Sequence, residues 1–438
     1  MFEEVLVEAQ SLLDAANFAD GEESAPQSVW SARVECYMRL CHKVEIWLQE
    51  GADICPPPTQ LLIILGGILG NGITSAKLYT SEDLKEVVSH SLKSLQLHCG
   101  VRSIRELLLL QPRISSHPPA ETLAIQFLRL CIARVARLPT DRRLTTPWDT
   151  CPLYRDALVW LTDQLDYPEI SEEEFIGAFQ PLGLQLTSDY RESLQLAGFQ
   201  LLQQLAHKAR VADWRQNNRA EAVLFQLFEH RITSNPNSSE QVVCSAYKTM
   251  FDMVRLLPEK VRAGWNIKLT DRLLLDLIME TRKNKQATLL HLLLKQMQYL
   301  QLGFIAHSRQ FFRAYSIIML GPRTPDCLMN SVASVEQDVT VYLLMLQCVQ
   351  LFLRLAWPLA GAMFLPDLIP PLVAFVDLEF ERAKQSSPVG TPPSHILPIF
   401  EQIKAILSML STIQPKLLGL LESVCEYSPS FAKLVPLP

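Results

Sequence analysis

Glycine is scarce in this sequence. There are 16 glycines among 438 residues, about half of the usual share of roughly 7%. Nucleotide-binding folds place several glycines beside the phosphates, because only glycine lets the backbone come so close. The one glycine-rich stretch, from Gly66 to Gly72, is followed by Ile73 and Thr74 and lacks the lysine of a phosphate-binding loop. We therefore expect no bound nucleotide and no other cofactor, and we interpret this stretch as helix ends with a flexible turn.

Charge is also low. Charged residues make up 20% of the chain, the net charge is -6 and the pI is about 5.9. Such a chain has no general electrostatic reason to bind nucleic acid or an anionic membrane. The first 20 residues carry acids such as Glu3, Glu4, Glu8 and Asp14 where a secretory leader needs basic residues, and the 10 cysteines are scattered, mostly through apolar stretches. We expect a reduced protein of the cytoplasm and nucleus.

Two apolar runs could be mistaken for membrane spans. Leu61 to Leu69 is too short, since a span needs about 20 residues. The run from Val339 to Val376 is long enough, but polar residues and prolines such as Gln347, Arg354 and Pro358 interrupt it. A pair of buried helices is the better interpretation, so no membrane partner is expected.

Leucine is abundant, at 73 residues or one in six, and leucine is a strong helix former. Apolar residues follow the helical period almost everywhere, for example over 288–300, 339–353, 194–205 and 123–135. Helix starts are predicted where serine or threonine precedes acids or glutamine near capping spacing, namely at Thr80 or Ser81 and at Ser171, Ser238 and Ser334.

Proline-rich breaks separate segments of one or two helices, and no alternating strand of convincing length is present. This pattern predicts an all-α fold, an α-solenoid of HEAT or armadillo-like repeats in which each helix pair needs neighbours to bury its apolar face. An irregular helical bundle is the structural alternative.

No catalytic or metal-binding motif emerges. Two partial ligand sets, Cys36, Cys41 and His42 and then His90, His98 and Cys99, lack the paired spacing of zinc sites. There is no nucleophile elbow, and the run Glu172 to Glu174 is typical of a helix first turn. We expect no metal and no catalytic residue, although a cysteine–histidine pair assembled from distant residues stays open.

Two basic clusters have two interpretations. One consists of Lys208, Arg210, Arg215 and Arg219, and the other is the run Arg282 to Lys285. Both lie between predicted helices, so the first interpretation is a solvated loop, in which cations also complement a helix C-terminus. The alternative is a docking patch for an acidic partner.

From about residue 185 onward the chain resembles the Tel-two-interacting protein two family. The similarity lies in Ser188-Asp189-Tyr190, in Gly198 within a leucine-rich helix, in Trp214, and in Asn218-Arg219-Ala220 opening a helix. A helix over 244–257, paired helices over 289–319 and the ending Ala356-Trp357-Pro358 follow in the same order. The resemblance covers roughly 240 residues, which divides the chain into an unmatched region, 1–180, and a family-like region, 181–438.

The resemblance implies a non-enzymatic scaffold. Members of this family belong to the triple-T co-chaperone complex, which looks after new phosphatidylinositol-three-kinase-related kinases such as mTOR, ATM, ATR and DNA-PK. The complex works with the ninety-kilodalton heat-shock chaperone and the RuvB-like ATPases. The implied direct partners are the two sister subunits, chiefly the largest HEAT-repeat subunit.

Six residues of the matched segments are candidates for partner contact: Asp189, Tyr190, Trp214, Asn218, Arg219 and Trp357. We expect Asp189 to cap a helix with Tyr190 half exposed. Capping or core packing is the first interpretation for each of the six residues. In the partner-contact interpretation, Trp214 and Arg219 lie at an exposed edge as the main contacts, since Trp and Arg are common binding hot spots. Two rival functions stay open: another HEAT-type adaptor, in nuclear transport or phosphatase assembly, and an all-α enzyme. Ser387 and Thr391, each before a proline, are candidate phosphorylation sites.

Overall fold

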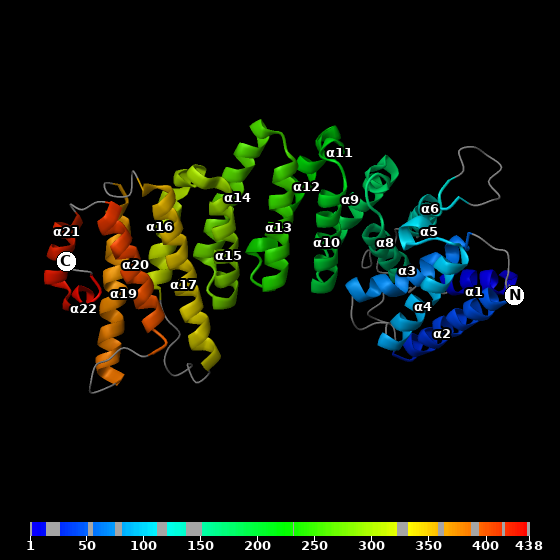
Figure 1. Cartoon of the computed structure of the whole chain (residues 1–438), viewed down its shortest axis with the longest axis horizontal. Coiled ribbons are helices and arrows are strands. Elements are labelled where there is room, and N and C mark those ends of the chain that lie inside the picture. The colour runs from blue at the N-terminus through cyan, green and yellow to red at the C-terminus, as the bar shows by residue number, and fades with distance from the viewer. Residues whose placement is uncertain are drawn as a thin grey trace. The chain divides into compact units, whose positions relative to one another are not determined.

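The computed structural model describes residues 2–14, 27–50, 56–74, 81–111, 121–136, 151–230, 232–321, 332–357, 363–386, 394–413 and 417–435. Within these ranges every regular element is a helix, as Figure 1 shows, so the all-α prediction is confirmed. Ser387 and Thr391 lie outside the described residues.

The chain forms two compact units. The first comprises residues 1–232 and 248–257, and the second comprises residues 233–247 and 258–438. Helix α13 (Glu240–Leu256) therefore contributes its first part to the second unit and its remainder to the first. The division at residue 180, which was drawn from the family resemblance, falls inside α9 (Glu173–Thr187) of the first unit and stays a prediction about relatedness.

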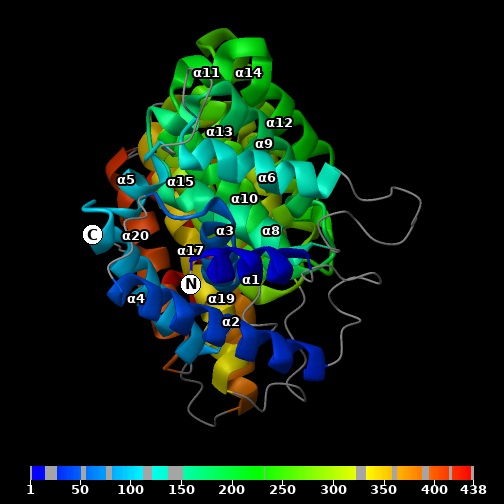
Figure 2. The ribbon, with the colours of Figure 1, turned by 90° about the vertical axis from the view of Figure 1, so that its right-hand side faces the viewer.

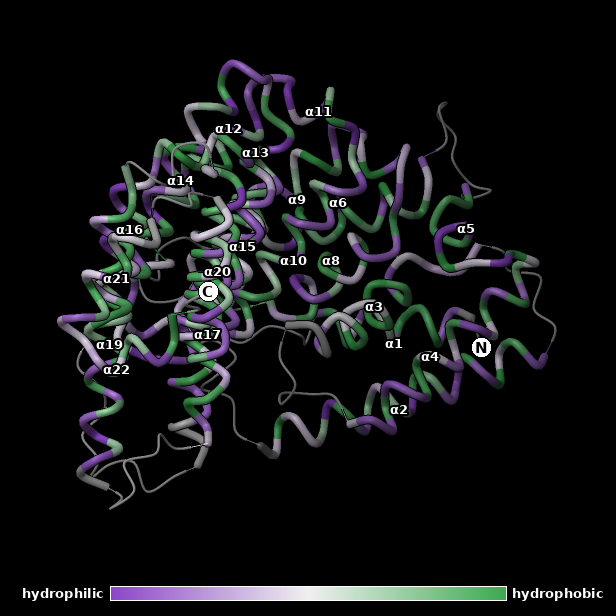
Figure 3. The backbone as a smooth tube through the Cα atoms, turned by 60° about the vertical axis from the view of Figure 1, so that its left-hand side comes forward, coloured by the Kyte–Doolittle hydropathy of each residue, from purple (hydrophilic) through white to green (hydrophobic). Residues whose placement is uncertain are grey.

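The first unit has a largely buried pair of helices, α3 and α8, which lie against each other (Figure 2). Figure 3 shows most of α3 as hydrophobic. Residues 152–162 of α8 are all buried, so the helix has no solvent-facing side. The helices of this unit are α1 (Phe2–Asp14), α2 (Gln27–Gln49), α3 (Thr59–Thr74), α4 (Glu82–His98), α5 (Ile104–Leu108), α6 (Leu123–Ala136), α8 (Pro152–Gln164), α9 (Glu173–Thr187), α10 (Glu192–Lys208), α11 (Val211–Arg215) and α12 (Arg219–Glu229).

The glycine stretch 66–72 lies within α3, which runs without a break from Thr59 to Thr74, so the predicted flexible turn is wrong. Glycine serves close packing here. A Cβ on Gly70 would lie 1.9 Å from the backbone oxygen of Asp156, and a Cβ on Gly66 would lie 2.4 Å from the Trp160 ring. The α3 backbone can approach α8 because these positions have no side chain.

The second unit consists of helix pairs packed on neighbouring pairs. Helix α14 packs on α15 and α16, α16 packs on α19, and α17 lies between α15 and α20. This packing is consistent with a helical repeat. The helices are α14 (Glu259–Met279), α15 (Lys283–Leu300), α16 (Ser308–Leu320), α17 (Val332–Leu355), α19 (Leu365–Ser386), α20 (Leu397–Ile413), α21 (Leu417–Tyr427) and α22 (Pro429–Ala432).

An aromatic cluster forms part of the core of the second unit. Phe352 of α17 stacks on Phe311 at 5.2 Å between ring centroids and meets Phe312 edge-on at 5.1 Å. Phe364 stacks on Phe312 at 5.5 Å. Each such pair adds stabilisation of about 0.5–1.5 kcal/mol beyond its buried area. The cluster joins α16 and α17 to the segment that precedes α19.

The apolar run 339–376 forms two helices, α17 and α19, as expected. By length and composition, residues Glu336–Leu355 of α17 could cross a membrane, but 56% of that window is buried inside the protein. A core helix of a soluble protein passes the same test, so this feature is weak support for a membrane span.

The predicted helix starts have mixed outcomes. Ser81 Oγ accepts a hydrogen bond from Leu84 N at 3.1 Å and caps α4, as predicted. At α13 the cap is Ser239 instead of Ser238, since Ser239 Oγ accepts from Val242 N. Ser171 does not cap α9, because its Oγ accepts from Arg210 N instead. The prediction at Ser334 is wrong too, since α17 begins earlier, at Val332.

Candidate partner-binding surface

The turn at Asp189 is held together by its own side chains. Asp189 Oδ1 accepts hydrogen bonds from the backbone nitrogen and from Nε of Arg191, both at 2.9 Å, and Oδ2 accepts from the Arg191 guanidinium at 2.9 Å. Gln195 Nε2 donates to the Asp189 carbonyl oxygen at 2.6 Å. Helix α10 begins at Glu192 after Arg191, so the expectation that Asp189 caps it is wrong.

Charge and burial at this turn favour an ionised Asp189. Burial alone would raise the pKa of the carboxyl, but the hydrogen bonds from Arg191 outweigh burial and hold the pKa below its usual value. The positive charge of the buried Arg155 acts in the same direction. Tyr190, in contrast, is 76% exposed, more than the half exposure that we expected, and Arg191 lies 5.4 Å from its ring centroid.

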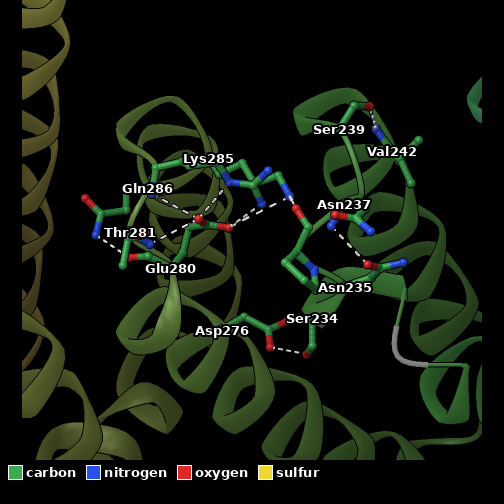
Figure 4. Close-up of polar contacts among 12 residues, drawn as sticks. Ser234, Asn235, Asn237, Ser239, Val242, Asp276, Glu280, Thr281, Lys285 and Gln286 are labelled. Carbon is green, nitrogen blue, oxygen red and sulfur yellow. Dashed lines mark hydrogen bonds and ion pairs between the residues drawn. The ribbon is translucent and has the colours of Figure 1, made fainter.

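The same turn recurs in the second unit, as Figure 4 shows. Glu280 Oε1 accepts from the backbone nitrogen of Arg282 at 2.9 Å and from its Nε at 3.1 Å, and Gln286 Nε2 donates to the Glu280 carbonyl oxygen at 2.6 Å. Arg282 precedes α15 just as Arg191 precedes α10. The same spacing of an acid, an arginine and a glutamine thus occurs at two places, Asp189-x-Arg191-x-x-x-Gln195 and Glu280-x-Arg282-x-x-x-Gln286.

A partial copy lies midway between them. Asn237 N donates to Asn235 Oδ1 at 3.0 Å, which reproduces the first bond of the turn (Figure 4), and Gln241 stands at the position of the glutamine. Asn235 follows Asp189 by 46 residues, and Glu280 follows Asn235 by 45. The turn therefore has a period of about 45 residues, which is the length of a HEAT or armadillo repeat.

Polar contacts between helices have similar separations. Gln203 bonds Thr249 across 46 residues, Arg219 pairs with Glu173 across 46, and Thr288 bonds Glu240 across 48. Each contact joins a helix to the corresponding helix of the adjacent pair. These separations are consistent with a helical repeat.

Trp214 does not lie at an exposed edge, so this expectation is wrong. Its side chain is completely buried, and its indole Nε1 donates to the Leu205 carbonyl oxygen at 3.1 Å. That carbonyl belongs to the last turn of α10, whose final carbonyls have no partner within the helix. Trp214 therefore closes the end of α10 and has no surface to offer a partner.

Asn218 and Arg219 lie at a helix opening, as expected. Asn218 precedes α12 and has a positive φ of 54°, a left-handed conformation that asparagine tolerates better than most residues. Arg219 begins α12, and its side chain is only 11% exposed because it forms an ion pair with Glu173 of α9. Arg219 therefore links two helices of the first unit and presents little of its charge to solvent.

The first basic cluster serves helix ends and internal ion pairs. Lys208 Nζ donates to the carbonyl oxygens of Thr162, Asp163 and Leu165 at the end of α8, at 3.1, 2.7 and 2.8 Å. Arg215 Nε likewise donates to the Leu256 carbonyl oxygen at the end of α13. The interpretation that these cations complement helix C-termini is confirmed for both residues.

The second basic cluster is also engaged. Besides the Arg282 bonds to Glu280, Lys283 pairs with Asp338 at 3.4 Å and lies 5.7 Å from the Tyr342 ring centroid. Lys285 is buried and pairs with Glu280 at 3.8 Å. Burial, together with the charge of Arg282, lowers the pKa of Lys285.

Trp357 follows the end of α17, where we expected it, and is 59% exposed. With Tyr190 it supplies exposed aromatic surface, the kind of side chain that dominates binding energies at interfaces. The two residues belong to different units. Of the six candidates, only these two have large rings that are more than half exposed.

A buried polar cluster joins α3 and α8. Asp156 Oδ1 accepts from Arg155 Nε at 2.8 Å, and Asp156 Oδ2 accepts from Asn71 Nδ2 at 3.0 Å. All three side chains are completely buried. A buried ion pair needs this hydrogen bonding to offset its loss of hydration. Because solvent does not reach these groups, the arrangement is suited to fixing helix positions.

The partial metal-ligand sets are engaged in other contacts. Arg39 donates to Cys36 Sγ at 3.3 Å, His90 Nδ1 lies 2.9 Å from Glu45 Oε1, and His98 packs against Trp47. Burial raises the pKa of the Cys41 thiol to about 11. Across the described ranges, no three histidine, cysteine or acidic side chains lie close enough together to hold a metal ion.

Comparisons with protein-family models, with curated proteins and with solved structures find no match to this chain.

Proposed function

We propose that the protein is a non-enzymatic scaffold built as an α-solenoid of HEAT-like repeats. The observation that carries this proposal is the turn that recurs at Asp189 and Glu280, with a partial copy at Asn235. Solenoids stack such units to give long surfaces that hold other proteins. The Arg155–Asp156 ion pair is completely buried, so a substrate cannot reach it, which supports a structural role for this pair instead of a catalytic one.

We propose further that this scaffold is a subunit of the triple-T co-chaperone complex. The support is the order of the family-like segments, from Ser188-Asp189-Tyr190 to Ala356-Trp357-Pro358. Its direct partners would be the two sister subunits, chiefly the largest one, and its indirect clients would be mTOR, ATM, ATR and DNA-PK in cytoplasm and nucleus. A subunit that binds only folded partners stabilises them by mass action, because the unfolded fraction falls as complex forms.

Exposure selects the contact residues within this proposal. Tyr190 and Trp357 are the anchors, at 76% and 59% exposure. Asp189, Asn218 and Arg219 act indirectly, because they fix the turns around α10 and α12. Large exposed aromatic side chains lose the most water when a partner covers them, and truncating such a side chain often costs 2 kcal/mol or more, on the order of a thirtyfold loss of affinity.

The deciding experiment is affinity purification of the full chain followed by mass spectrometry. We expect both sister subunits in near-stoichiometric amounts. Recovery of transport cargo or of phosphatase subunits without the sisters would overturn the triple-T proposal in favour of another HEAT-type adaptor. If the purified chain catalyses the conversion of any small molecule, the proposal that the protein is not an enzyme would be overturned.

A variant pair tests the anchors. Tyr190→Ala combined with Trp357→Ala is expected to reduce recovery of the sister subunits by about tenfold or more. Tyr427→Ala is the matched control, because Tyr427 is 91% exposed and lies outside the matched segments. Equal recovery with both proteins would contradict the assignment of Tyr190 and Trp357, while circular dichroism checks that both remain folded.

A further inference from the structure

Two neighbouring helices of the second unit expose apolar side chains on adjoining ridges. Leu275 and Met279 of α14 are 49% and 73% exposed, and Ile317 and Leu320 of α16 are 39% and 51% exposed. Helices α14 and α16 pack directly against each other. Residues four apart lie on one ridge of a helix, so Leu275 and Met279 form one exposed ridge.

One side-chain contact fixes the position of the two ridges relative to each other along the helix axes. His307, just before α16, lies with its Nδ1 2.6 Å from Oδ1 of Asp271 on α14. Leu275 and Met279 follow Asp271 by one and two turns, and Ile317 follows His307 by nearly three. By the rise of a helix, Met279 and Ile317 therefore reach about the same level, toward the C-terminal ends of both helices.

Two arginines stand beside this apolar surface. Arg309 and Arg313 are exposed and lie on the α16 ridge that continues to Ile317. Neither forms an ion pair with any residue that the structure describes, in contrast to the clusters around Lys208 and Lys285, whose cations hold the fold together. Asp271, the acid on the facing ridge, is already engaged by His307.

We propose that these six residues, Leu275, Met279, Arg309, Arg313, Ile317 and Leu320, form a docking face for an acidic amphipathic helix of a partner protein. The α14–α16 face matches that occupant in two ways. Its ridges of side chains four residues apart accept the ridges of another helix. Its two arginines are one turn apart, about 6 Å along the axis, which is the spacing of two acids at i and i+4 on a partner helix.

Charge decides between this occupant and others. A basic or neutral helix would leave both guanidinium groups without a partner where the interface removes water, and an unpaired buried charge is costly. An acidic helix pairs both guanidinium groups and covers the four apolar side chains with its own. The inference rests on the proposed function only in assigning a protein partner, and it holds whichever complex the chain joins.

The test selects ligands from a displayed library of random helical peptides, with the full chain as the target. We expect the enriched peptides to combine an apolar stripe with net negative charge. A double variant, Arg309→Glu with Arg313→Glu, should bind them about tenfold or more weakly, since each reversed pair removes an attraction and adds a repulsion. Ile317→Ser with Leu320→Ser should also abolish enrichment.

A matched control keeps the test specific. Lys295 of α15 is exposed and forms no ion pair with a described residue, so Lys295→Glu changes charge away from the face and should leave peptide binding within about twofold. Failure to enrich acidic helices, or equal binding by Arg309→Glu/Arg313→Glu, would overturn the proposal. Loss of the sister subunits in purification, with acidic helices still selected, would overturn only the triple-T proposal.

Two further measurements address other occupants. Vesicles of phosphatidylserine and phosphatidylcholine should not bind the chain, and sedimentation velocity should show no dimer that Ile317→Ser/Leu320→Ser removes. Binding to the vesicles that depends on Arg309 and Arg313 would assign the face to lipid and overturn the proposal. A dimer lost in the serine variant would assign the face to a second copy, with the same consequence.

Discussion

The side-chain Nε2 of Gln286 donates a hydrogen bond of 2.6 Å to the backbone oxygen of Glu280, six residues earlier. Gln195 makes the same bond to Asp189 at the same distance and spacing. In each case the glutamine lies in the first turn of a helix and reaches back to the acid that opens the preceding turn. The bond fixes the angle at which one helix follows another, and its recurrence is consistent with a helical repeat.

Removing this bond should weaken the second unit. Gln286 is 6% exposed, so Gln286→Ala leaves a carbonyl without its donor in a site that water hardly reaches, at a cost of about 1 kcal/mol. Urea unfolding followed by circular dichroism measures the loss. Gln347→Ala is the control, since Gln347 is exposed on α17, and it should change stability by less than about 0.5 kcal/mol. Equal stability of the two variants would show that the bond contributes nothing.

The glycines of α3 give a second prediction. Gly70→Ala places a Cβ 1.9 Å from the Asp156 backbone oxygen, so α3 and α8 must separate, and we expect the first unit to lose about 3 kcal/mol or more. In α9, Gly177 has nothing within 4 Å of a built Cβ. Gly177→Ala should therefore stabilise the protein by up to about 1 kcal/mol, because alanine favours a helix. Thermal unfolding of both variants provides the measurement, and similar melting temperatures would refute the close approach.

Local signals in the sequence predicted local structure. The capping pattern at Ser81 predicted the start of α4, since the serine oxygen and its donor, the backbone N–H of Leu84, lie three residues apart. Apolar periodicity predicted α10, α15 and α17 for the same reason. The glycines of α3 were misread because their role depends on Trp160 and Asp156, some 90 residues away in sequence.

The candidate site was harder to predict. Tryptophan is a residue type that is common in binding hot spots, but Trp214 is buried because α10 ends beside it. The recurring turn does have a sequence signal, which is acid-x-Arg-x-x-x-Gln at 189–195 and 280–286. The signal is hard to recognise because the two full copies are far apart and the copy between them, at Asn235, is only partial. The sequence does not show which basic residues form ion pairs within the fold, so it could not distinguish Arg309 and Arg313 from the paired cations.

Trp214 should behave as a core residue. Trp214→Ala removes a completely buried ring and one of the two hydrogen bonds to the Leu205 carbonyl oxygen, which also accepts from Ala209 N, so we expect a loss of about 3–5 kcal/mol. Trp357→Ala removes a ring that is 59% exposed and should cost less than about 1 kcal/mol. Denaturant unfolding of the two variants separates these roles. A stable, fully helical Trp214→Ala protein would restore Trp214 as a candidate surface contact.

Alkaline pH should destabilise the first unit through α2. Burial raises the pKa of Cys41 to about 11 and that of Tyr37 to about 12, against ordinary values of 9.0 and 10.0. As the pH rises past 9, the unfolded chain loses these protons while the folded chain keeps them. The unfolded state then binds fewer protons, so the free energy of unfolding falls with pH until the folded groups also titrate.

The expected loss is on the order of 2–3 kcal/mol for each group between pH 9 and 12. Urea unfolding at pH 8, 9.5 and 11 measures it. The double variant Tyr37→Phe with Cys41→Ser has no ionisable group at either position, so its stability should fall less steeply over this range. Other buried thiols and phenols, such as Cys131 and Tyr247, contribute equally to both proteins and cancel in the comparison. A pH dependence identical in the two proteins would contradict the burial of Cys41 and Tyr37 as its cause.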